Sequence, residues 1–228
     1  MRQFAVIGLG RFGYNVAETL IKKGYEVLAI DNDEEKIEKA SDFATYAVQC
    51  DATDVKALKA ISTQNVDVAV VSIGEDIEAS ILIVMTLKEL GVGQIIAKAV
   101  TPIHGRILMN LGVTEVIFPE RDAAVRLAHR LIAPNVLEYL ELSPGYSFEE
   151  IAVPSKIAGK KLKESQIRTL FGVNVIAVKK KVARVVKGTV KKEEILNVSP
   201  AGDDVLEKGD ILVIVGREED LERFSKIE

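Results

Sequence analysis

The sequence predicts an α/β protein in which a doubly wound parallel Rossmann sheet is followed by a second, smaller α+β domain. Three observations support this: β-branched runs alternate with helix-period runs, a glycine-rich loop joins the first such pair, and the rhythm changes after about residue 135. Strands separated by helices pair in parallel through right-handed crossovers. The runs that predict strands of the first domain are Phe4–Leu9, Val27–Asp31, Ala44–Cys50, Val66–Ile73, Ile95–Ala99 and Val113–Phe118.

Helices of the first half are predicted from amphipathic spacing and from residues that cap or end a helix. Aspartate directly before an apolar-periodic run is a typical N-cap, and glycine or proline after such a run ends it. The first helix follows the glycine loop and ends before Gly24. The others are Glu34–Ala40 after Asp33, Val55–Ala60 after Asp54, Ile77–Leu90 after Asp76, and Ala123–Ile132 before Pro134.

The second half has a different organisation. A domain boundary is predicted near Asn135 to Pro144, which divides the chain into residues 1–135 and 136–228. The second part is too small for a typical dehydrogenase substrate domain. After a turn at Ser143-Pro144-Gly145, its predicted strands are Phe148–Val153, Val173–Lys180, Ala183–Lys187 and Ile211–Val215, and its helices are Leu162–Leu170 and Glu218–Phe224.

Composition limits the functional classes. The chain has 30 Lys plus Arg against 34 Asp plus Glu, a net charge of -4, so nucleic acid is not expected as a partner. Cys50 is the single cysteine, which rules out an intrachain disulfide and fits the cytoplasm. The longest apolar run, Ser80–Leu87, is too short to span a bilayer, and the N-terminus shows no cleavable signal. We therefore expect no direct membrane insertion.

The loop Gly8-Leu9-Gly10-Arg11-Phe12-Gly13 predicts a nucleotide site. Gly8 permits a tight turn, Gly10 lets the backbone approach phosphate, and Gly13 lets helix and strand pack closely. The helix N-terminus offers N–H groups to phosphate, and Asp31, at the end of the next strand, can bind ribose hydroxyls. The alternative is that the glycines serve packing alone.

Charged residues refine this site. Arg11 can reach phosphate oxygens beyond those held by the backbone, which would favour a polyphosphate, or it is an exposed arginine at a helix start. Asp31, Asn32 and Asp33 together would repel a 2′-phosphate, so NADP is disfavoured.

Further candidates follow other strands, where open α/β sheets bind ligands. Two loops qualify, although simple turn chemistry explains either one almost equally well. Lys98 could pair with phosphate or be an ordinary exposed lysine, and Cys50 is better explained as a small buried side chain than as a nucleophile. The loops consist of Cys50, Asp51, Ala52 and Thr53, and of Ser72, Ile73, Gly74 and Glu75.

Catalytic constellations are not evident. His104 and His129 are the two histidines, and neither lies beside a serine, cysteine or acid cluster in the sequence; His129 fits a solvated helix face. A nicotinamide enzyme needs a proton donor and a substrate pocket, and no residues stand out for either. The sequence therefore favours a binding module without catalytic chemistry, and an NAD-dependent oxidoreductase is the alternative. A third alternative, a transcription factor, would need a DNA-binding element that the sequence does not show.

With these motifs in order, including Ser72–Asp76 and Pro119-Glu120, the chain resembles the regulatory subunits of bacterial Trk/Ktr potassium uptake systems, built from TrkA-N (RCK) and TrkA-C domains. The Gly-Arg-Phe-Gly form of the loop is more specific than a generic Rossmann loop. In the second half, two stretches resemble the family's small ligand-sensing and dimerisation domain, namely Ile157–Leu162 and Asp203–Gly216.

The resemblance implies a cytoplasmic, non-enzymatic gating ring. Such proteins bind ATP or ADP, and also NAD(H), and form octameric rings of dimers beneath a membrane potassium-translocating subunit. Arg11 would sense the terminal phosphate at a subunit interface, and Glu120 would lie near a divalent cation between subunits, although it could equally be a helix-start acid. Arg168 falls near a cyclic dinucleotide position, but the basic stretch Arg184–Lys192 departs from the pattern and could be a solvated hairpin.

Overall fold

The computed structural model describes residues 2–133, 135–186 and 189–227, with the backbone alone for 181–186 and 189–193. The chain divides into two compact units, Met1–Arg121 and Asp122–Glu228. The division falls earlier than the predicted boundary at Asn135–Pro144, because those residues are not a linker. Val136–Ser143 forms strand β7, whose pairing with the next strand places it inside the second sheet.

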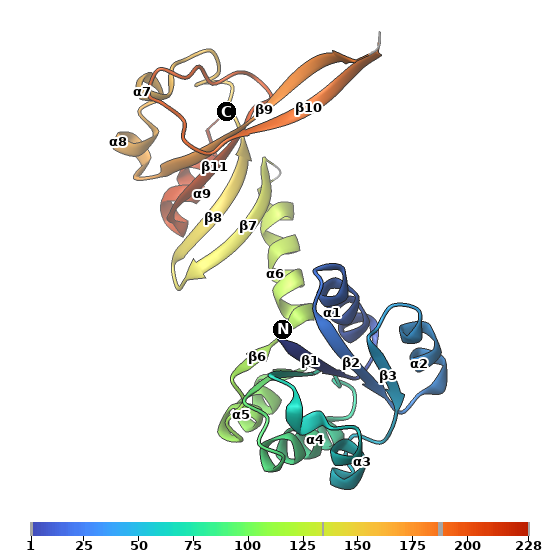
Figure 1. The fold of residues 1–228 in the computed structure, drawn as a ribbon. Helices are drawn as coiled ribbons and strands as arrows, with labels where there is room; N and C mark the ends of the chain where they lie inside the picture. Colours follow the sequence, from blue (N-terminus) through green and yellow to red (C-terminus); the bar gives the residue numbers. More distant parts are fainter. Residues whose placement is uncertain (1, 134, 187–188, 228) are drawn as a thin grey trace. The chain divides into compact units, whose positions relative to one another are not determined.

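The first unit is a six-stranded parallel sheet in the order β3-β2-β1-β4-β5-β6, which confirms the predicted Rossmann fold (Figure 1). Its strands lie within or one residue beyond the predicted runs, since burial on both faces selects continuous apolar segments. They are β1 Gln3–Ile7, β2 Glu26–Asp31, β3 Tyr46–Gln49, β4 Val68–Val71, β5 Gln94–Lys98 and β6 Glu115–Ile117.

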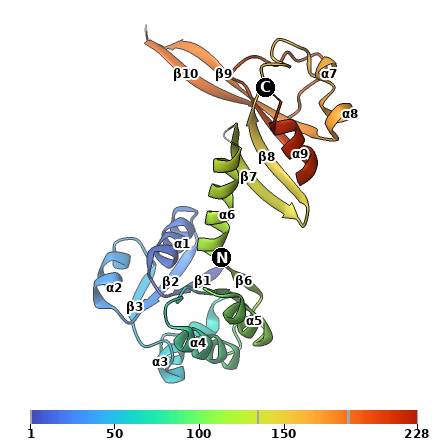
Figure 2. The ribbon, with the colours of Figure 1, turned by 180° about the vertical axis from the view of Figure 1, so that it is seen from behind.

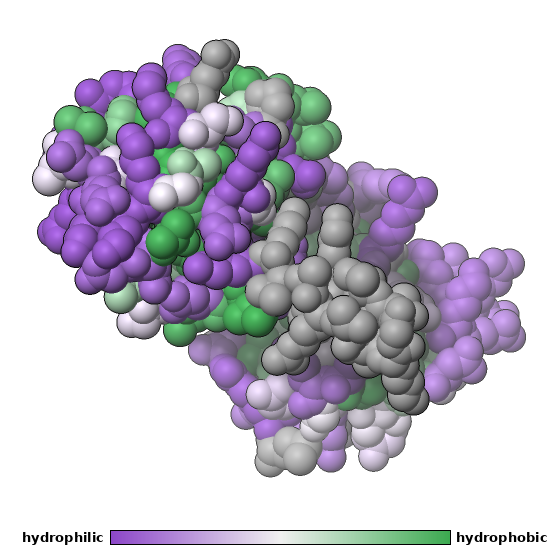
Figure 3. All heavy atoms as spheres, turned by 90° about the horizontal axis from the view of Figure 1, so that it is seen from above, coloured by the Kyte–Doolittle hydropathy of each residue, from purple (hydrophilic) through white to green (hydrophobic). Residues whose placement is uncertain are grey.

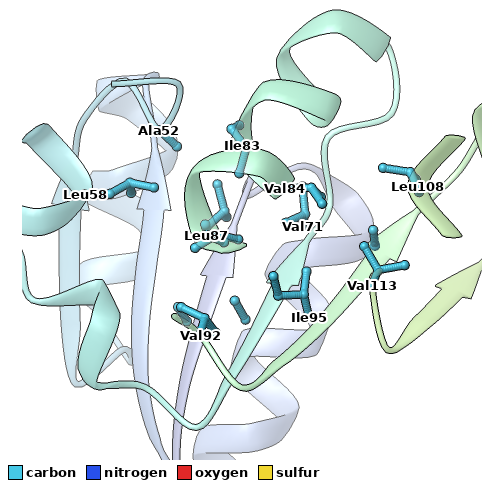
Figure 4. Packing of buried hydrophobic residues seen from close by; sticks show 14 of the residues in the cluster. Ala52, Leu58, Val71, Ile83, Val84, Leu87, Val92, Ile95, Leu108 and Val113 are labelled. Atoms are coloured by element: carbon cyan, nitrogen blue, oxygen red, sulfur yellow. The ribbon is translucent and has the colours of Figure 1, made fainter. Parts of the chain in front are cut away.

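Helices cover both faces of this sheet, as the two views in Figures 1 and 2 show. Helices α1 and α2 pack on one face, whereas α3, α4 and α5 pack on the other, where apolar side chains such as Leu58, Ile83 and Ile95 interlock (Figure 4). Helix α5 begins with Thr101 and Pro102, a cap and an N1 proline that the sequence analysis overlooked. The helices are α1 Arg11–Lys22, α2 Glu34–Ser41, α3 Val55–Ala60, the 3-10 turn Thr63–Asn65, α4 Ile77–Glu89 and α5 Pro102–Asn110.

The second unit is a five-stranded antiparallel sheet in the order β10-β9-β11-β8-β7, with α8 and α9 packed against it. Helix α6, Pro119–Ile132, links the units and starts four residues before its prediction. The strands are β7 Val136–Ser143, β8 Tyr146–Ala152, β9 Asn174–Val186, β10 Thr189–Asn197 and β11 Ile211–Arg217; the helices are α7 Leu162–Ser165, α8 Ile167–Phe171 and α9 Glu218–Ser225.

Two predictions for this unit are wrong in detail. The predicted strands Val173–Lys180 and Ala183–Lys187 are one continuous strand, β9, because its partner β10 extends the ladder to Val186. The predicted helix Leu162–Leu170 is broken at Gln166, whose φ of 53° is left-handed. The stretch Arg184–Lys192 does form the two arms of a hairpin, while its side chains and residues 187–188 lie outside the described residues.

Hydrophilic residues predominate over the described part of the surface seen in Figure 3, and hydrophobic ones form small scattered patches on that face. No helix among the described residues is long and apolar enough to cross a membrane.

Candidate functional site

A cavity of about 1090 Å³ lies at the carboxyl edge of the parallel sheet, lined entirely by residues of the first unit. All six strands deliver residues to it, since parallel strands end on the same side and their loops converge there. The residues at or just beyond the strand ends are Ile7, Asp31, Cys50, Ser72, Lys98 and Phe118.

The glycine loop forms one wall of this cavity. Gly8 has a φ of 91°, a left-handed value that favours glycine, and its N–H donates to the Ile30 carbonyl at 2.8 Å. A Cβ on Gly8 would lie 2.9 Å from Ile73 Cγ1, so the turn also needs a residue without a side chain. Gly10 is the N-cap of α1 and has open space where a Cβ would stand. The backbone is thus exposed to a ligand at Gly10.

The N-terminus of α1 differs from those of its neighbours. Helices α2, α3, α4 and α5 each begin at a residue whose side chain accepts from a backbone N–H, namely Asp33, Asp54, Asp76 and Thr101. Helix α1 has no side-chain cap and no acid in its first turn. The positive end of its dipole therefore faces the cavity uncompensated by its own sequence.

Asp31 organises the loop from the end of β2. Its buried carboxylate accepts from the Leu9 N–H at 2.6 Å and from the Asp33 N–H at 3.0 Å. Lys36 Nζ lies 3.3 Å from the same group. An ionised carboxylate offers about four lone-pair positions, and Lys36 Nζ also lies 3.4 Å from Oδ2, so a ribose hydroxyl would take the place of a Lys36 contact.

Lys98 and Glu120 lie at the other side of the cavity. Lys98 Nζ donates to Glu120 Oε1 at 2.6 Å, and this hydrogen bond is the first cause of a lowered pKa for the Glu120 carboxyl. A Cβ on Gly74 would lie 3.2 Å from Lys98 Cε, so the glycine leaves room for the lysine stem. The side chain of Lys98 is largely buried, and the Glu120 carboxylate is the acidic partner that compensates its charge.

The Cys50–Thr53 loop combines a local turn with cavity lining. Asp51 Oδ1 accepts from the Thr53 hydroxyl at 2.7 Å and from its N–H at 2.9 Å, which lowers the pKa of Asp51. Burial raises the pKa of the Cys50 thiol, and Asp51 and Asp54 raise it further. A thiol held protonated in this way is a poor nucleophile, as the sequence analysis expected.

Comparison with known proteins places this chain in a family. Residues 4–119 match the TrkA-N domain and residues 148–228 match the TrkA-C domain. The chain belongs to the TrkA family. It is 42% identical to Ktr system potassium uptake protein C of Bacillus subtilis (strain 168) over 225 residues, covering 99% of this chain and 96% of that protein.

Other relatives agree. Ktr system potassium uptake protein A of Vibrio alginolyticus is 33% identical, with 96% of this chain and 94% of that protein covered. The structure of the GsuK RCK domain has the same fold, with a TM-score of 0.64, 18% identity and 99% of this chain covered. This TrkA-family chain spans about half, 47%, of that structure's length. These relatives are named as potassium uptake proteins, in agreement with the predicted resemblance to the Trk/Ktr subunits.

The TrkA-N cavity gathers sixteen of the eighteen residues predicted for the site. Gly13 and Asp33 are the exceptions. A Cβ on Gly13 would lie 2.0 Å from the Gly8 carbonyl, so this glycine serves the packing of α1 against β1. Asp33 accepts from the Glu35 N–H at 3.0 Å and caps α2 instead. The residues gathered are Gly8, Gly10, Arg11, Phe12, Asp31, Asn32, Cys50, Asp51, Ala52, Thr53, Ser72, Ile73, Gly74, Glu75, Lys98 and Glu120.

Several lining residues were missed. Lys36 lies in the first turn of α2, and its contact with Asp31 could be predicted only from the side of the helix that faces β2. Arg121 follows Glu120, and its guanidinium lies 4.1 Å from the Phe118 ring centroid. The remaining missed residues come from strand ends and from the start of α4, and they are Ile7, Asp76, Ala79, Ile83, Ala99, Val100 and Phe118.

The histidines play no part in this site. Burial lowers the pKa of His104, and neither ring nitrogen has a hydrogen-bond partner among the described residues. His129 stacks on Tyr139 with ring centroids 3.7 Å apart, so its prediction as a purely solvated residue is wrong. The described residues contain no group of three or more His, Cys, Asp or Glu that could hold a metal ion, so Glu120 could at most contribute one ligand to a shared site.

Proposed function

We propose that this TrkA-family protein is the nucleotide-binding regulatory subunit of a membrane potassium uptake system and that it responds to ATP versus ADP. The observation that carries the proposal is the uncapped N-terminus of α1, which opens onto a cavity lined by Arg11 and Lys98. The names of the Ktr relatives supply the potassium uptake context.

The phosphates would bind at the N-terminus of α1 and the ribose at Asp31. The backbone around Gly10 can approach a phosphate closely, because no side chain stands between them. Arg11 adds a permanent charge on a long side chain at the first helical position. Asp31 and Asn32 both line the cavity and would disfavour a 2′-phosphate, so we propose ADP, ATP or NAD(H) as ligands in preference to NADP. The fold neighbour described as the GsuK channel bound to NAD, with a TM-score of 0.53, keeps NAD among the ligands to test.

ATP and ADP would differ in what they do to the Lys98–Glu120 ion pair. A terminal phosphate reaching Lys98 competes with Glu120 for the ammonium, and the released carboxylate could then bind a divalent cation at a subunit interface. A tenfold preference of one ring shape for ATP biases that shape by about 1.4 kcal/mol per site. Several sites in one ring would add their effects.

Assembly is the second part of the proposal. Exposed apolar side chains on α4 and α5 include Met85, Ile103 and Met109, of which Ile103 is 62% exposed. Such residues favour association. We propose dimers that build an octameric ring on the cytoplasmic face of the potassium-translocating subunit, with the TrkA-C unit serving ligand sensing and dimerisation.

Calorimetric titration of nucleotide-free protein with ATP, ADP, NAD and NADH, with and without Mg²⁺, tests the ligand. The Arg11→Ala variant should shrink the ratio of ATP to ADP affinity by about tenfold, the scale of one charge-assisted hydrogen bond, while changing ADP affinity less. Lys23→Ala, at the opposite end of α1, is the matched control and should change neither. If Arg11→Ala weakens ATP and ADP equally, Arg11 does not sense the terminal phosphate. NADH binding accompanied by carbonyl reduction would replace the proposal with an oxidoreductase.

A further inference from the structure

One face of the antiparallel sheet carries polar side chains beneath helix α9. Glu149 on β8 lies opposite Tyr139 on β7 and Ile214 on β11, and directly paired residues point to the same face of a sheet. Ser147, two residues before Glu149, shares that face. Helix α9 packs on β8 and β11 and starts at Glu218.

Glu149 and Ser147 are buried, and each has a side-chain oxygen with no partner among the described residues. Glu149 is 8% exposed and Ser147 is fully buried, and among the described residues neither Glu149 Oε2 nor Ser147 Oγ has a hydrogen bond. A buried polar atom normally has a partner, and a buried carboxylate without one is costly. Both atoms lie on one strand face, and their hydrogen-bonding capacity is unused by the described residues.

Glu218 and Tyr139 face the same place. The Tyr139 hydroxyl donates to Glu218 Oε1 at 2.9 Å, and His129 stacks on the Tyr139 ring. Burial, and then the charge of Glu218, raise the pKa of Glu149 to about 7. A positive charge between Glu149 and Glu218 would offset the repulsion of the two carboxylates.

We propose that Glu149, Glu218, Ser147 and the Tyr139 hydroxyl form a binding site for a hard cation, with a divalent ion of the Ca²⁺ type favoured. All the donors are oxygens, two of them from carboxylates, and Ca²⁺ accepts mixed oxygen ligands in flexible geometry, whereas Mg²⁺ demands near-ideal octahedra and retains water. The site uses two acids and two hydroxyls, which is consistent with the described residues containing no group of three or more His, Cys, Asp or Glu. It lies in the second unit, Asp122–Glu228, and does not depend on the proposed nucleotide site.

Terbium luminescence on the full-length, nucleotide-free protein tests this site. Tb³⁺ substitutes for Ca²⁺ and emits when a tyrosine beside it absorbs, and the chain has no tryptophan to interfere. Wild-type protein at pH 8 should show sensitised emission that Ca²⁺ displaces more readily than Mg²⁺, Na⁺ or K⁺. In Glu149→Gln, Tb³⁺ affinity should fall by about tenfold or more, because the variant lacks the carboxylate ligand.

Glu222→Gln is the matched control, since Glu222 lies on the same helix but pairs with Lys226 on the exposed surface. It should retain wild-type affinity. Glu120→Gln should also retain it, which separates this site from any cation in the TrkA-N cavity. Because glutamine is isosteric and neutral, Glu149→Gln should fold, and circular dichroism verifies this. Absent emission in wild-type protein, or equal affinity in Glu149→Gln and Glu222→Gln, would overturn the proposal and leave Glu149 as a neutral buried acid.

Discussion

In the parallel sheet Asp31 and Lys98 are the last residues of their strands, whereas in the antiparallel sheet Glu149 lies in the middle of a strand, under a helix. Asp31 at the end of β2 has backbone and lysine donors around its carboxylate. Glu149 has an unpartnered oxygen and an acidic neighbour among the described residues. The first arrangement stabilises a charge, and the second disfavours it.

The difference follows from strand geometry. Parallel strands send all their loops from one edge, so free N–H groups and glycine turns gather around any acid placed there. In the middle of an antiparallel strand the backbone N–H groups are already committed to the ladder, so a buried acid must find side chains, a proton or a cation. The carboxyl edge of the parallel sheet therefore favours anions, and the face of the antiparallel sheet under α9 favours positive charge.

The largest expected effect tests whether glycines at that edge serve packing or ligand binding. Gly13→Ala should lower the unfolding free energy of the first unit by about 3 kcal/mol or more, because the new methyl meets the Gly8 carbonyl oxygen at 2.0 Å and the backbone must shift. Urea unfolding followed by circular dichroism measures this loss.

Gly10→Ala is its counterpart. Open space surrounds the added methyl, and the Gly10 φ of -63° suits alanine, so the fold should be unaffected. The methyl would nevertheless stand where phosphate approaches, and ADP affinity should fall by calorimetry. Equal destabilisation of the two variants would contradict the division of roles between the two glycines.

The second effect concerns Glu149 and pH. Its pKa is raised from an ordinary 4.5 to about 7, so the native state binds a proton that the unfolded state has released. The resulting stabilisation is complete below pH 4.5 and is lost as the pH rises through 7, by up to about 3 kcal/mol. Urea unfolding in EDTA between pH 5 and 8 should show this slope in the wild type and lose it in Glu149→Gln. A parallel slope in both would mean that Glu149 is not the titrating group.

The sequence predicted the parallel half apart from α5, because most of the signals in this half are local. Asp33, Asp54 and Asp76 cap the helices predicted after them, and Gly8 adopts the φ that its loop requires. Lys98 was placed in the site as a phosphate partner, while its ion pair with Glu120, 22 residues away, depends on how two neighbouring strand ends meet. Such a contact has no periodic signature.

The antiparallel half was harder to predict because its pattern depends on pairing. Strand β7, Val136–Ser143, has apolar residues that alternate poorly with polar ones, and it pairs with β8 with two irregularities in register. Glu149 reads as a surface residue in the run Phe148–Val153, and only the cover of α9 shows that it is buried. Tertiary context decides both, which local propensity does not contain.

The smallest effect tests the reassignment of Asp33 from ligand residue to helix cap. Asp33→Ala should lower the unfolding free energy by about 1 kcal/mol, because the Glu35 N–H loses its acceptor, while Asp33→Asn keeps a cap and should cost much less. Neither variant should change ADP affinity, since Asp33 does not line the cavity although Asp31 and Asn32 do. If calorimetry instead finds weaker ADP binding in both variants, the carboxylate of Asp33 reaches the ribose after all. Asp33 would then both cap α2 and bind the ligand. Helix α1 differs, because no side chain caps its N-terminus and its N–H groups stay available to a ligand.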